Sequence, residues 1–132
     1  MKKIILLVCL LLLFIFAVFI FKKRPSTTNT ISYDLNGKTY QLLTAVNPTQ
    51  WETGLMYYRN LKNGDGMIFV FPDSEYRSFW NKNTYMNLDV YWISGKKVVG
   101  KNFLPSIEKS KTTVVISSPE KVDKVIELMS GK

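Results

Sequence analysis

The sequence predicts a mainly β protein, a small antiparallel β barrel or sandwich with one short helix, preceded by one N-terminal transmembrane helix. Two observations predict the β domain. About seven short apolar or alternating segments, separated by turn residues, follow residue 30, and only one segment carries a helix-start signal. The transmembrane helix is predicted from an uninterrupted apolar run at residues 4–21.

The apolar run at 4–21 contains no charged residue, and basic residues flank it on both sides. As a helix, it would span about 27 Å, which is adequate for a thin hydrocarbon core. No pair of small residues marks a cleavage site after the run, so we predict an uncleaved membrane anchor, with a cleaved signal peptide as the alternative. The predicted division of the chain is an anchor with basic flanks (1–24), a polar linker (25–30) and a β domain (31–132). We expect a single-pass cell-membrane protein with this domain on the extracytoplasmic side.

The formal net charge of +8 is concentrated near the apolar run. Five of the 18 basic residues flank that run, which leaves 13 bases against ten acids, or +3, for residues 25–132. Basic residues beside a membrane segment favour anionic headgroups. The remaining lysines are scattered and form no basic helix, so no nucleic-acid partner is expected.

The residue inventory narrows the chemistry that the domain can perform. There is no histidine, and the only cysteine, Cys9, lies in the apolar run. This composition excludes a Ser-His-Asp triad, a cysteine nucleophile, a disulfide framework and a Cys/His zinc site. The acids show no calcium-loop spacing, and there is no glycine-rich phosphate or dinucleotide motif, so no cofactor is expected.

The first part of the domain predicts a hairpin followed by the helix. Asn36-Gly37 suits a type I′ turn between strands at 31–35 and 38–42, the second of which is expected to continue to Val46. Asn47-Pro48 with Gln50 is an N-cap pattern, and the helix is predicted to run from Pro48 to about Met56. Gly54 inside that helix suggests close backbone approach or an early end.

The rest of the domain predicts further strands. Met67–Phe71 is a continuous apolar run with β-branched and aromatic residues, closed by Pro72, and is typical of a buried strand. A polar loop at 73–77 and a polar excursion at 104–111 interrupt the pattern. The other strands are expected at Leu88–Ile93, Lys97–Phe103, Thr112–Ser117 and Lys121–Leu128.

The segment at 78–83 breaks the usual sorting of apolar from polar side chains. In an extended strand, Trp80 would share one face with Lys82, and Phe79 would share the other with Asn81. Neither face is purely apolar or purely polar. Such local conflicts are expected at functional or strained sites, so this segment is predicted to carry a site.

Several motifs together resemble the bacterial and archaeal family called domain of unknown function 192, over about Leu42 to Gly131. The motifs are Glu52-x-Gly54-Leu55-Met56-x-x-Arg59-x-Leu61, Gly66-Met67-x-Phe69-x-Phe71-Pro72, Phe79-Trp80-x-Lys82-Asn83-Thr84 and Leu88-Asp89. The resemblance implies a small, mostly antiparallel β barrel with a short helix, often behind a signal or an anchor. It implies no established activity.

The chain departs from the pattern of this family in three places. Asn81 stands where the family usually has Met, and Asn87 stands where it usually has Pro. Most members also continue past the glycine that matches Gly131 into a further strand. Without that strand, we expect either an open sheet edge or a replacement of the strand by the N-terminal hairpin. An open edge at 122–128 would invite self-association or capture of another envelope protein.

Six residues are predicted to form a binding site: Arg59, Trp80, Lys82, Asn83, Thr84 and Asp89. Each has a structural alternative. Lys82 could act as a base or nucleophile, or pack along Trp80, and the two tryptophans at 80 and 92 could be core residues. Arg59 could bind an anion, or pair with Glu52 or Asp89. Asn83 and Thr84 could bind a hydroxyl group or close a turn.

Two functions remain open. The first is a non-catalytic binding module for a small polar ligand, a glycan or an envelope protein. The second is an envelope hydrolase or transferase that uses Lys82 with Glu52 or Asp89. Most acid–base designs near neutral pH use histidine or a thiol, and the domain has neither. We therefore expect binding rather than catalysis.

Overall fold

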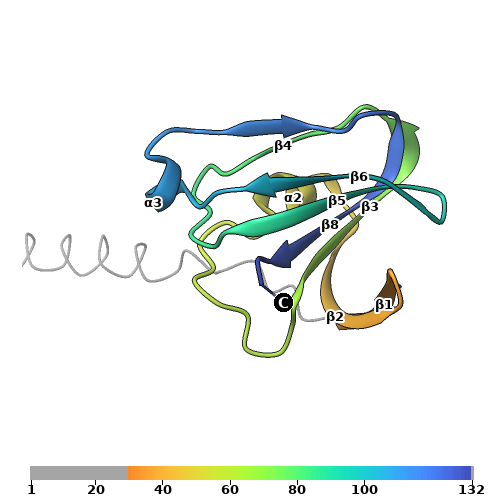
Figure 1. Ribbon diagram of the computed structural model, residues 1–132, viewed down its shortest axis with the longest axis horizontal. Helices are drawn as coiled ribbons and strands as arrows, with labels where there is room; N and C mark the ends of the chain where they lie inside the picture. Colours follow the sequence, from red (N-terminus) through yellow and green to blue (C-terminus); the bar gives the residue numbers. More distant parts are fainter. Residues whose placement is uncertain (1–29, 132) are drawn as a thin grey trace, which may run out of the picture.

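The computed structural model describes residues 30–131, which form two β sheets and two short helices (Figure 1). The strands are β1 (Thr30–Leu35), β2 (Lys38–Ala45), β3 (Gly66–Glu75), β4 (Ser78–Trp80), β5 (Leu88–Ser94), β6 (Lys97–Leu104), β7 (Val115–Ser117) and β8 (Val122–Met129). The helices are α2 (Pro48–Thr53) and α3 (Ile107–Ser110). The predicted anchor at 4–21 lies outside the described residues. Within residues 30–131, no helix has the length and apolarity that crossing a membrane requires.

The sheets are open, so of the two predicted architectures, a β barrel or a sandwich, the described strands do not close into a barrel. Six strands pair in the order β1-β2-β3-β8-β5-β6, and β4 pairs with β7 in a separate ribbon above them. β1 and β6 end the larger sheet and do not pair with each other in the described part of the chain. The β2–β3 pair is parallel, because α2 carries the chain across between them, and the other pairs are antiparallel. The mainly β class with a short helix is confirmed.

The larger sheet has an apolar cluster on each face. The inner face, which α2 and the β4–β7 ribbon cover, buries Ala45, Leu55, Met67, Phe69, Phe71, Met86, Leu88, Val90, Trp92, Leu104, Val122 and Val125. The outer face buries Leu35, Tyr40, Leu42, Ile68, Ile93, Ile126 and Leu128. Along β5, the alternate residues Leu88, Val90 and Trp92 are all buried on the inner face.

Helix α2 begins where the sequence predicts and ends earlier. The Asn47 side chain accepts a hydrogen bond from the Gln50 backbone N–H at 3.0 Å, and the Gln50 side chain accepts one from the Val46 N–H at 2.8 Å. The helix stops at Thr53 instead of Met56, because Gly54 adopts a φ of +46°. A Cβ on Gly54 would lie 3.1 Å from the Phe69 ring, so the backbone also approaches the sheet closely here.

Three predicted boundaries need correction. β3 does not end at Pro72 but continues to Glu75, because its register with β8 shifts between Val70 and Glu75 and releases Pro72 from the ladder. In the segment at 78–83, only Ser78–Trp80 is a strand. The predicted strand at 112–117 shortens to Val115–Ser117, and the polar excursion before it contains the single turn of α3.

The expected open edge at 122–128 is also wrong. β8 pairs with β3 on one side and with β5 on the other, so it lies inside the larger sheet. Self-association through this strand stays an untested expectation, but the unpaired edge on which it depended is not present among the described strands.

We expect the Gly66→Ala substitution to destabilise the domain by about 3 kcal/mol or more. A Cβ on Gly66 would lie 1.9 Å from the backbone oxygen of Glu127, so β3 and β8 would have to separate. Urea unfolding followed by tryptophan fluorescence measures the loss. Gly64→Ala is the milder control, since the nearest atom to its Cβ would be 3.3 Å away. Equal, small losses for both variants would contradict the close approach of these strands.

Candidate functional site

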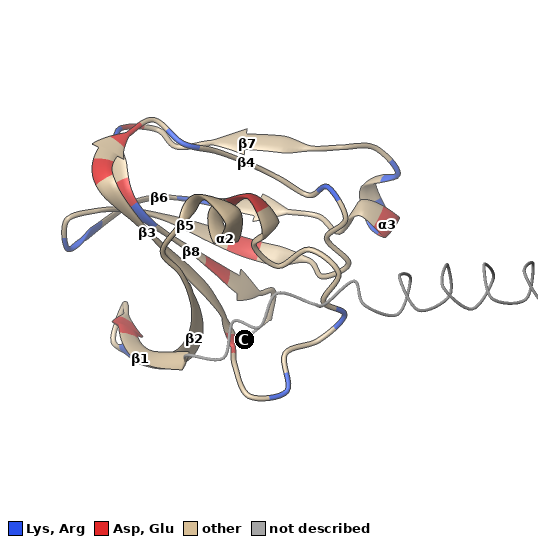
Figure 2. Ribbon diagram, turned by 180° about the vertical axis from the view of Figure 1, so that it is seen from behind, with Lys and Arg blue, Asp and Glu red and all other residues tan. Residues whose placement is uncertain are grey.

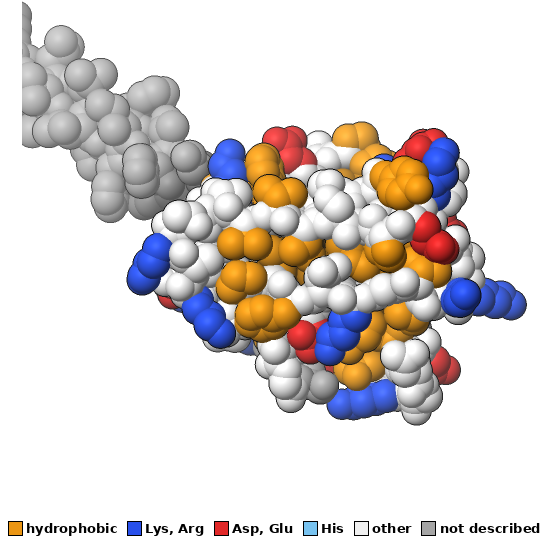
Figure 3. Space-filling model, turned by 45° about the horizontal axis from the view of Figure 1, so that its top comes forward, with side chains coloured by type: hydrophobic (Ala, Val, Ile, Leu, Met, Phe, Trp, Pro, Cys, Tyr) orange, Lys and Arg blue, Asp and Glu red, His pale blue; other side chains and the backbone are white. Residues whose placement is uncertain are grey.

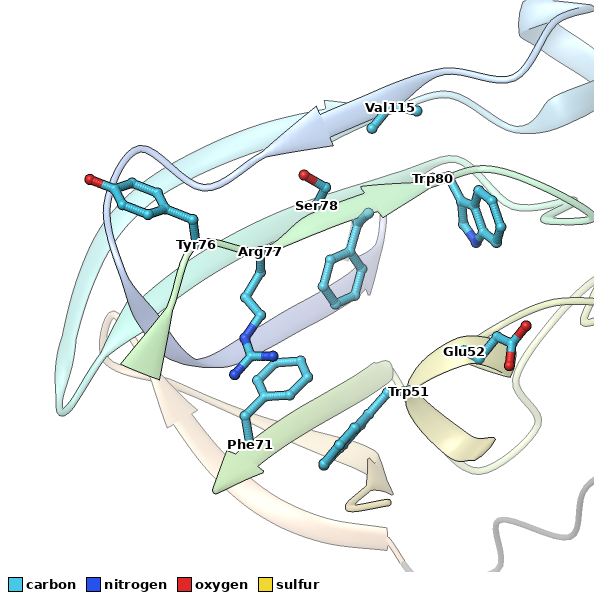
Figure 4. A pocket seen from close by; sticks show the side chains of 9 residues that line it. Trp51, Glu52, Phe71, Tyr76, Arg77, Ser78, Trp80 and Val115 are labelled. Carbon is cyan, nitrogen blue, oxygen red and sulfur yellow. The ribbon is translucent and has the colours of Figure 1, made fainter. Parts of the chain in front are cut away.

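A cleft of about 500 Å³ separates α2 from the β4–β7 ribbon on the inner side of the larger sheet. Its lining residues are Trp51, Glu52, Phe71, Tyr76, Arg77, Ser78, Phe79, Trp80 and Val115 (Figure 4). Five of these nine are aromatic. The space-filling view shows hydrophobic side chains gathered over the middle of the exposed face, with charged side chains toward its margin (Figure 3). Apolar walls with a few polar groups are typical of ligand sites.

The helix side of the cleft is held in place by Trp51. Its indole N–H donates to the backbone oxygens of Ala45 at 3.0 Å and Val70 at 3.1 Å. Its ring lies 5.1 Å from that of Phe71, between centroids. These contacts tie α2 to both β2 and β3, so the indole face is a rigid wall.

The ribbon side is anchored by Phe79. Its ring meets that of Phe69 edge-to-face at 4.8 Å and that of Trp92 at 5.7 Å, which fixes β4 over the sheet. The next residue, Trp80, keeps 42% of its surface exposed and lines the cleft. Trp80 is therefore an accessible aromatic surface on a firmly held strand.

Two charged side chains of opposite sign lie along the cleft. Arg77 extends onto the Phe71 ring, with its guanidinium carbon 3.8 Å from the ring centroid, and forms an ion pair with Asp73. Its backbone is held by Ser118 through two hydrogen bonds, at 2.8 and 3.0 Å. Glu52 projects from α2 at the other end, on the side of Trp80 (Figure 4). The cleft thus offers both hydrogen-bond donors and acceptors.

A second, much smaller pocket of about 20 Å³ adjoins the cleft and shares Trp51, Glu52, Phe79 and Trp80 with it. Its other lining residues are Thr53, Gly54, Leu55, Met56, Phe69, Thr84 and Glu127. Glu127 comes from the inner face of β8 and is only 4% exposed. Burial without a compensating charge raises the pKa of Glu127 from 4.5 to about 8.

The structure brings three of the six predicted site residues to the cleft or its rim. Trp80 lines both pockets, and Lys82 lies with its ammonium 5.0 Å from the Trp80 ring centroid, as its packing alternative predicts. Thr84 is buried, lines the smaller pocket and donates to the Lys82 backbone oxygen at 3.2 Å.

Asn83 and Arg59 lie to one side of the cleft. Asn83 has a φ of +53° and donates to the Tyr57 hydroxyl at 2.9 Å, which supports its turn role. Arg59 forms an exposed ion pair with Glu108 at 3.1 Å and stacks on the Tyr85 ring. The structural alternative, that Arg59 pairs with a carboxylate, is confirmed, but its partner is Glu108 and not Glu52 or Asp89.

Asp89 lies on the opposite face of the larger sheet. Since Leu88 and Val90 point inward, Asp89 between them points outward and pairs with Lys101 at 3.1 Å. The hydrogen bonds that the Lys101 ammonium donates to Tyr91 and Asp89 raise the pKa of Lys101 above its usual 10.5. The structure therefore does not bring Lys82 and Asp89 together.

The prediction from sequence missed Trp51, Arg77 and Glu127. For Glu127 a signal was present, because Val125-Ile126-Glu127-Leu128 places one acid inside an otherwise apolar strand. Arg77 carried no comparable signal, since an arginine in a polar connection is common. Trp51 stood in the predicted helix, but nothing local indicated that its ring would form a wall of a cleft.

Comparison with known proteins gives a family and a fold. The family model DUF192, described as "Uncharacterized ACR", matches residues 31–132. A crystal structure of a candidate transcription regulator from Sinorhizobium meliloti is 34% identical, with a TM-score of 0.61, over 77% of this chain and 79% of that one. A protein of unknown function from Novosphingobium aromaticivorans is 16% identical, with a TM-score of 0.58, over 83% and 88% of the two chains. No curated protein matches the chain. The chain therefore belongs to the DUF192 family.

Proposed function

We propose that the domain is a non-catalytic binding module that holds a glycan in the cleft between α2 and the β4–β7 ribbon. The observation that carries this proposal is the cleft itself, about 500 Å³ in volume and lined by rings that the fold holds in place. Ligand sites commonly have volumes of about 300–1,000 Å³ and largely apolar walls. Exposed aromatic residues on rigid elements provide binding surface at low entropic cost.

The side chains in the cleft suit a saccharide. The C–H face of a pyranose is apolar and can stack on an indole such as that of Trp80. Its hydroxyl groups can donate to the Glu52 carboxylate and accept from the Arg77 guanidinium, both of which line the cleft. A small polar ligand of another class or an extended protein segment would use fewer of these contacts.

The alternative of a lysine–carboxylate enzyme has less support. Lys82 packs on Trp80, whereas Asp89 pairs with Lys101 on the other face of the sheet. A base and its partner need hydrogen-bond contact with each other or with one substrate. The geometry therefore favours binding over chemistry by this pair.

We also propose that the module is tethered to the cell membrane on the extracytoplasmic side. The support is the uncharged apolar run at 4–21 with its basic flanks. A polar linker at 25–30 would then hold the cleft near the envelope, where glycans are abundant.

The Trp80→Ala variant is expected to bind oligosaccharides at least about tenfold more weakly, because it removes an accessible stacking surface. Titration with cello- and chito-oligosaccharides, followed by NMR of the tryptophan indole N–H signals, measures the change. Phe103→Ala is the matched control, since Phe103 is similarly exposed, at 46%, but does not line the cleft. Equal binding by wild type and Trp80→Ala, or no saccharide binding by the wild type, would refute the proposal.

A further inference from the structure

The carboxyl group of Glu127 is buried in a way that is unusual for a residue with a purely structural role. It lies on the inner face of β8, opposite Met67 of β3 and Val90 of β5. Within the described part of the chain, burial is the only cause of its raised pKa, with no hydrogen bond or charge to offset it, and 96% of the residue is buried. Glu127 is not among the fully buried, unpaired side-chain groups of residues 30–131, so what remains accessible of its carboxyl group faces the small pocket that it lines. A buried polar group without a partner costs free energy, so its retention suggests that something else satisfies it.

The small pocket is where that partner would sit. Glu127 lines it, and a Cβ placed on Gly54 would lie 3.9 Å from Oε2 of Glu127, so the glycine leaves the carboxyl group open toward α2. The pocket volume of about 20 Å³ admits one group the size of a water molecule. Figure 2 shows acidic positions on both α2 and β8 in this region.

The charges and rings around the pocket favour a cation. Glu52 on α2 is the other ionisable side chain among the described lining residues, and no lysine or arginine is among them. From β3 the pocket receives Phe69, from β4 it receives Phe79 and Trp80, and none of these carries a charge. Two carboxyl groups among aromatic faces attract an ammonium group and repel an anion.

We infer that the small pocket binds a primary ammonium group against the Glu127 carboxylate, through the opening that it shares with the cleft. Together with the proposed function, on which this extension rests, the ligand class is a saccharide that bears a primary amine. The sugar ring would stack in the cleft, and the amine would enter between Trp51 and Trp80 toward Glu127. The Thr84 hydroxyl, which also lines the pocket, is available as a second oxygen partner.

Binding of the cation requires Glu127 to lose its proton. Because its pKa is about 8 in the free protein, it is mostly neutral at pH 7, and the incoming ammonium must displace the proton. The affinity for the amine should therefore rise roughly tenfold from pH 6 to pH 7, level off near pH 8, and fall again as the amine itself loses its proton at higher pH. Binding at pH 7 should release about one proton per ligand.

The test uses the full-length chain and three probes: methyl glucoside, its 6-amino-6-deoxy analogue and n-butylamine. Calorimetry in buffers of different ionisation enthalpy gives both affinity and proton release. We expect the amino sugar to bind at least tenfold more tightly than methyl glucoside at pH 8. Glu127→Gln should abolish this preference and the proton release, while methyl glucoside binding stays unchanged.

Each outcome decides between the two proposals. If methyl glucoside binds but the amino sugar binds no more tightly, the ammonium pocket is refuted and the glycan module survives. If butylamine binds with proton release but neither sugar binds, the pocket is supported and the glycan proposal fails. If no amine binds, the inference is wrong. Should Glu127→Gln not fold, the wild-type pH profile of amine affinity and the proton release on amine binding carry the test.

Discussion

The free energy of unfolding is expected to fall as the pH rises from about 4.5 to about 8. Burial raises the pKa of Glu127 from 4.5 to about 8, so between these values the folded chain holds a proton that the unfolded chain releases. The folded state is therefore progressively disfavoured with rising pH, and the loss levels off above pH 8. The change in pKa corresponds to roughly 5 kcal/mol at about 1.36 kcal/mol per pH unit.

Urea unfolding of the full-length chain at a series of pH values measures this dependence, with Glu127→Gln as the control. The variant should lack the decrease and should be more stable than the wild type at pH 8. Two other groups act outside this window. The pKa of Asp123 is lowered by Lys124 and by the Gly95 N–H despite partial burial, so the stability that it contributes is present above about pH 4 and is lost only below it. The pKa of Lys101 is raised, so the stability that it contributes is present up to its usual pKa of 10.5 and is lost only above it. If the free energy of unfolding of the wild type and of Glu127→Gln changed in parallel between pH 5 and 8, the raised pKa of Glu127 would be contradicted.

The Asn81→Ala variant is expected to lose about 3–5 kcal/mol of stability. Asn81 is fully buried, and its side chain makes three hydrogen bonds to the segment that leads from β6 to β7. It donates to the Pro105 oxygen at 2.9 Å and to Ser110 Oγ at 2.8 Å, and it accepts from the Val114 N–H at 2.8 Å. Each buried group left without its partner costs about 1–3 kcal/mol.

The Asn81→Met variant separates the contribution of hydrogen bonding to stability from that of side-chain volume, because Met fills the space without forming these hydrogen bonds. Met is also the residue that the family resemblance predicts at this position. We expect Asn81→Met to be destabilised nearly as much as Asn81→Ala. Exposed Asn63→Ala is the control and should change stability by less than about 0.5 kcal/mol. Denaturant unfolding decides, and a fully stable Asn81→Met would show that packing, not hydrogen bonding, holds this connection.

Asn81 also explains why the segment at 78–83 mixes apolar and polar side chains on both of its predicted faces. The strand alternation that placed Lys82 opposite Asn81 does not apply, because β4 ends at Trp80 and a turn begins at once. The mixed pattern did indicate an unusual role, but that of Asn81 is to bind a distant backbone. Only the tertiary contact with Val114 reveals this role, and no local pattern could show it.

Local signals predicted local structure well. The Asn36-Gly37 hairpin, the Asn47 cap and the buried strand at Met67–Phe71 depend on neighbours in sequence, and each is confirmed. The order of strands in the sheet and the composition of the cleft depend on long-range pairing. Trp51, Arg77 and Trp80 meet because α2 and β4 cover the same sheet face, which residue patterns alone do not specify.

The position of β8 also affects when the domain can fold during its synthesis. β8 is the last strand along the chain, yet it joins β3 to β5 in the middle of the larger sheet. Until Val122–Met129 has emerged, the hairpins β1–β2 and β5–β6 have no common partner, and the apolar sides of β3 and β5 stay uncovered. Folding must therefore await completion of residue 129 and proceeds through contacts distant in sequence, which makes it slow.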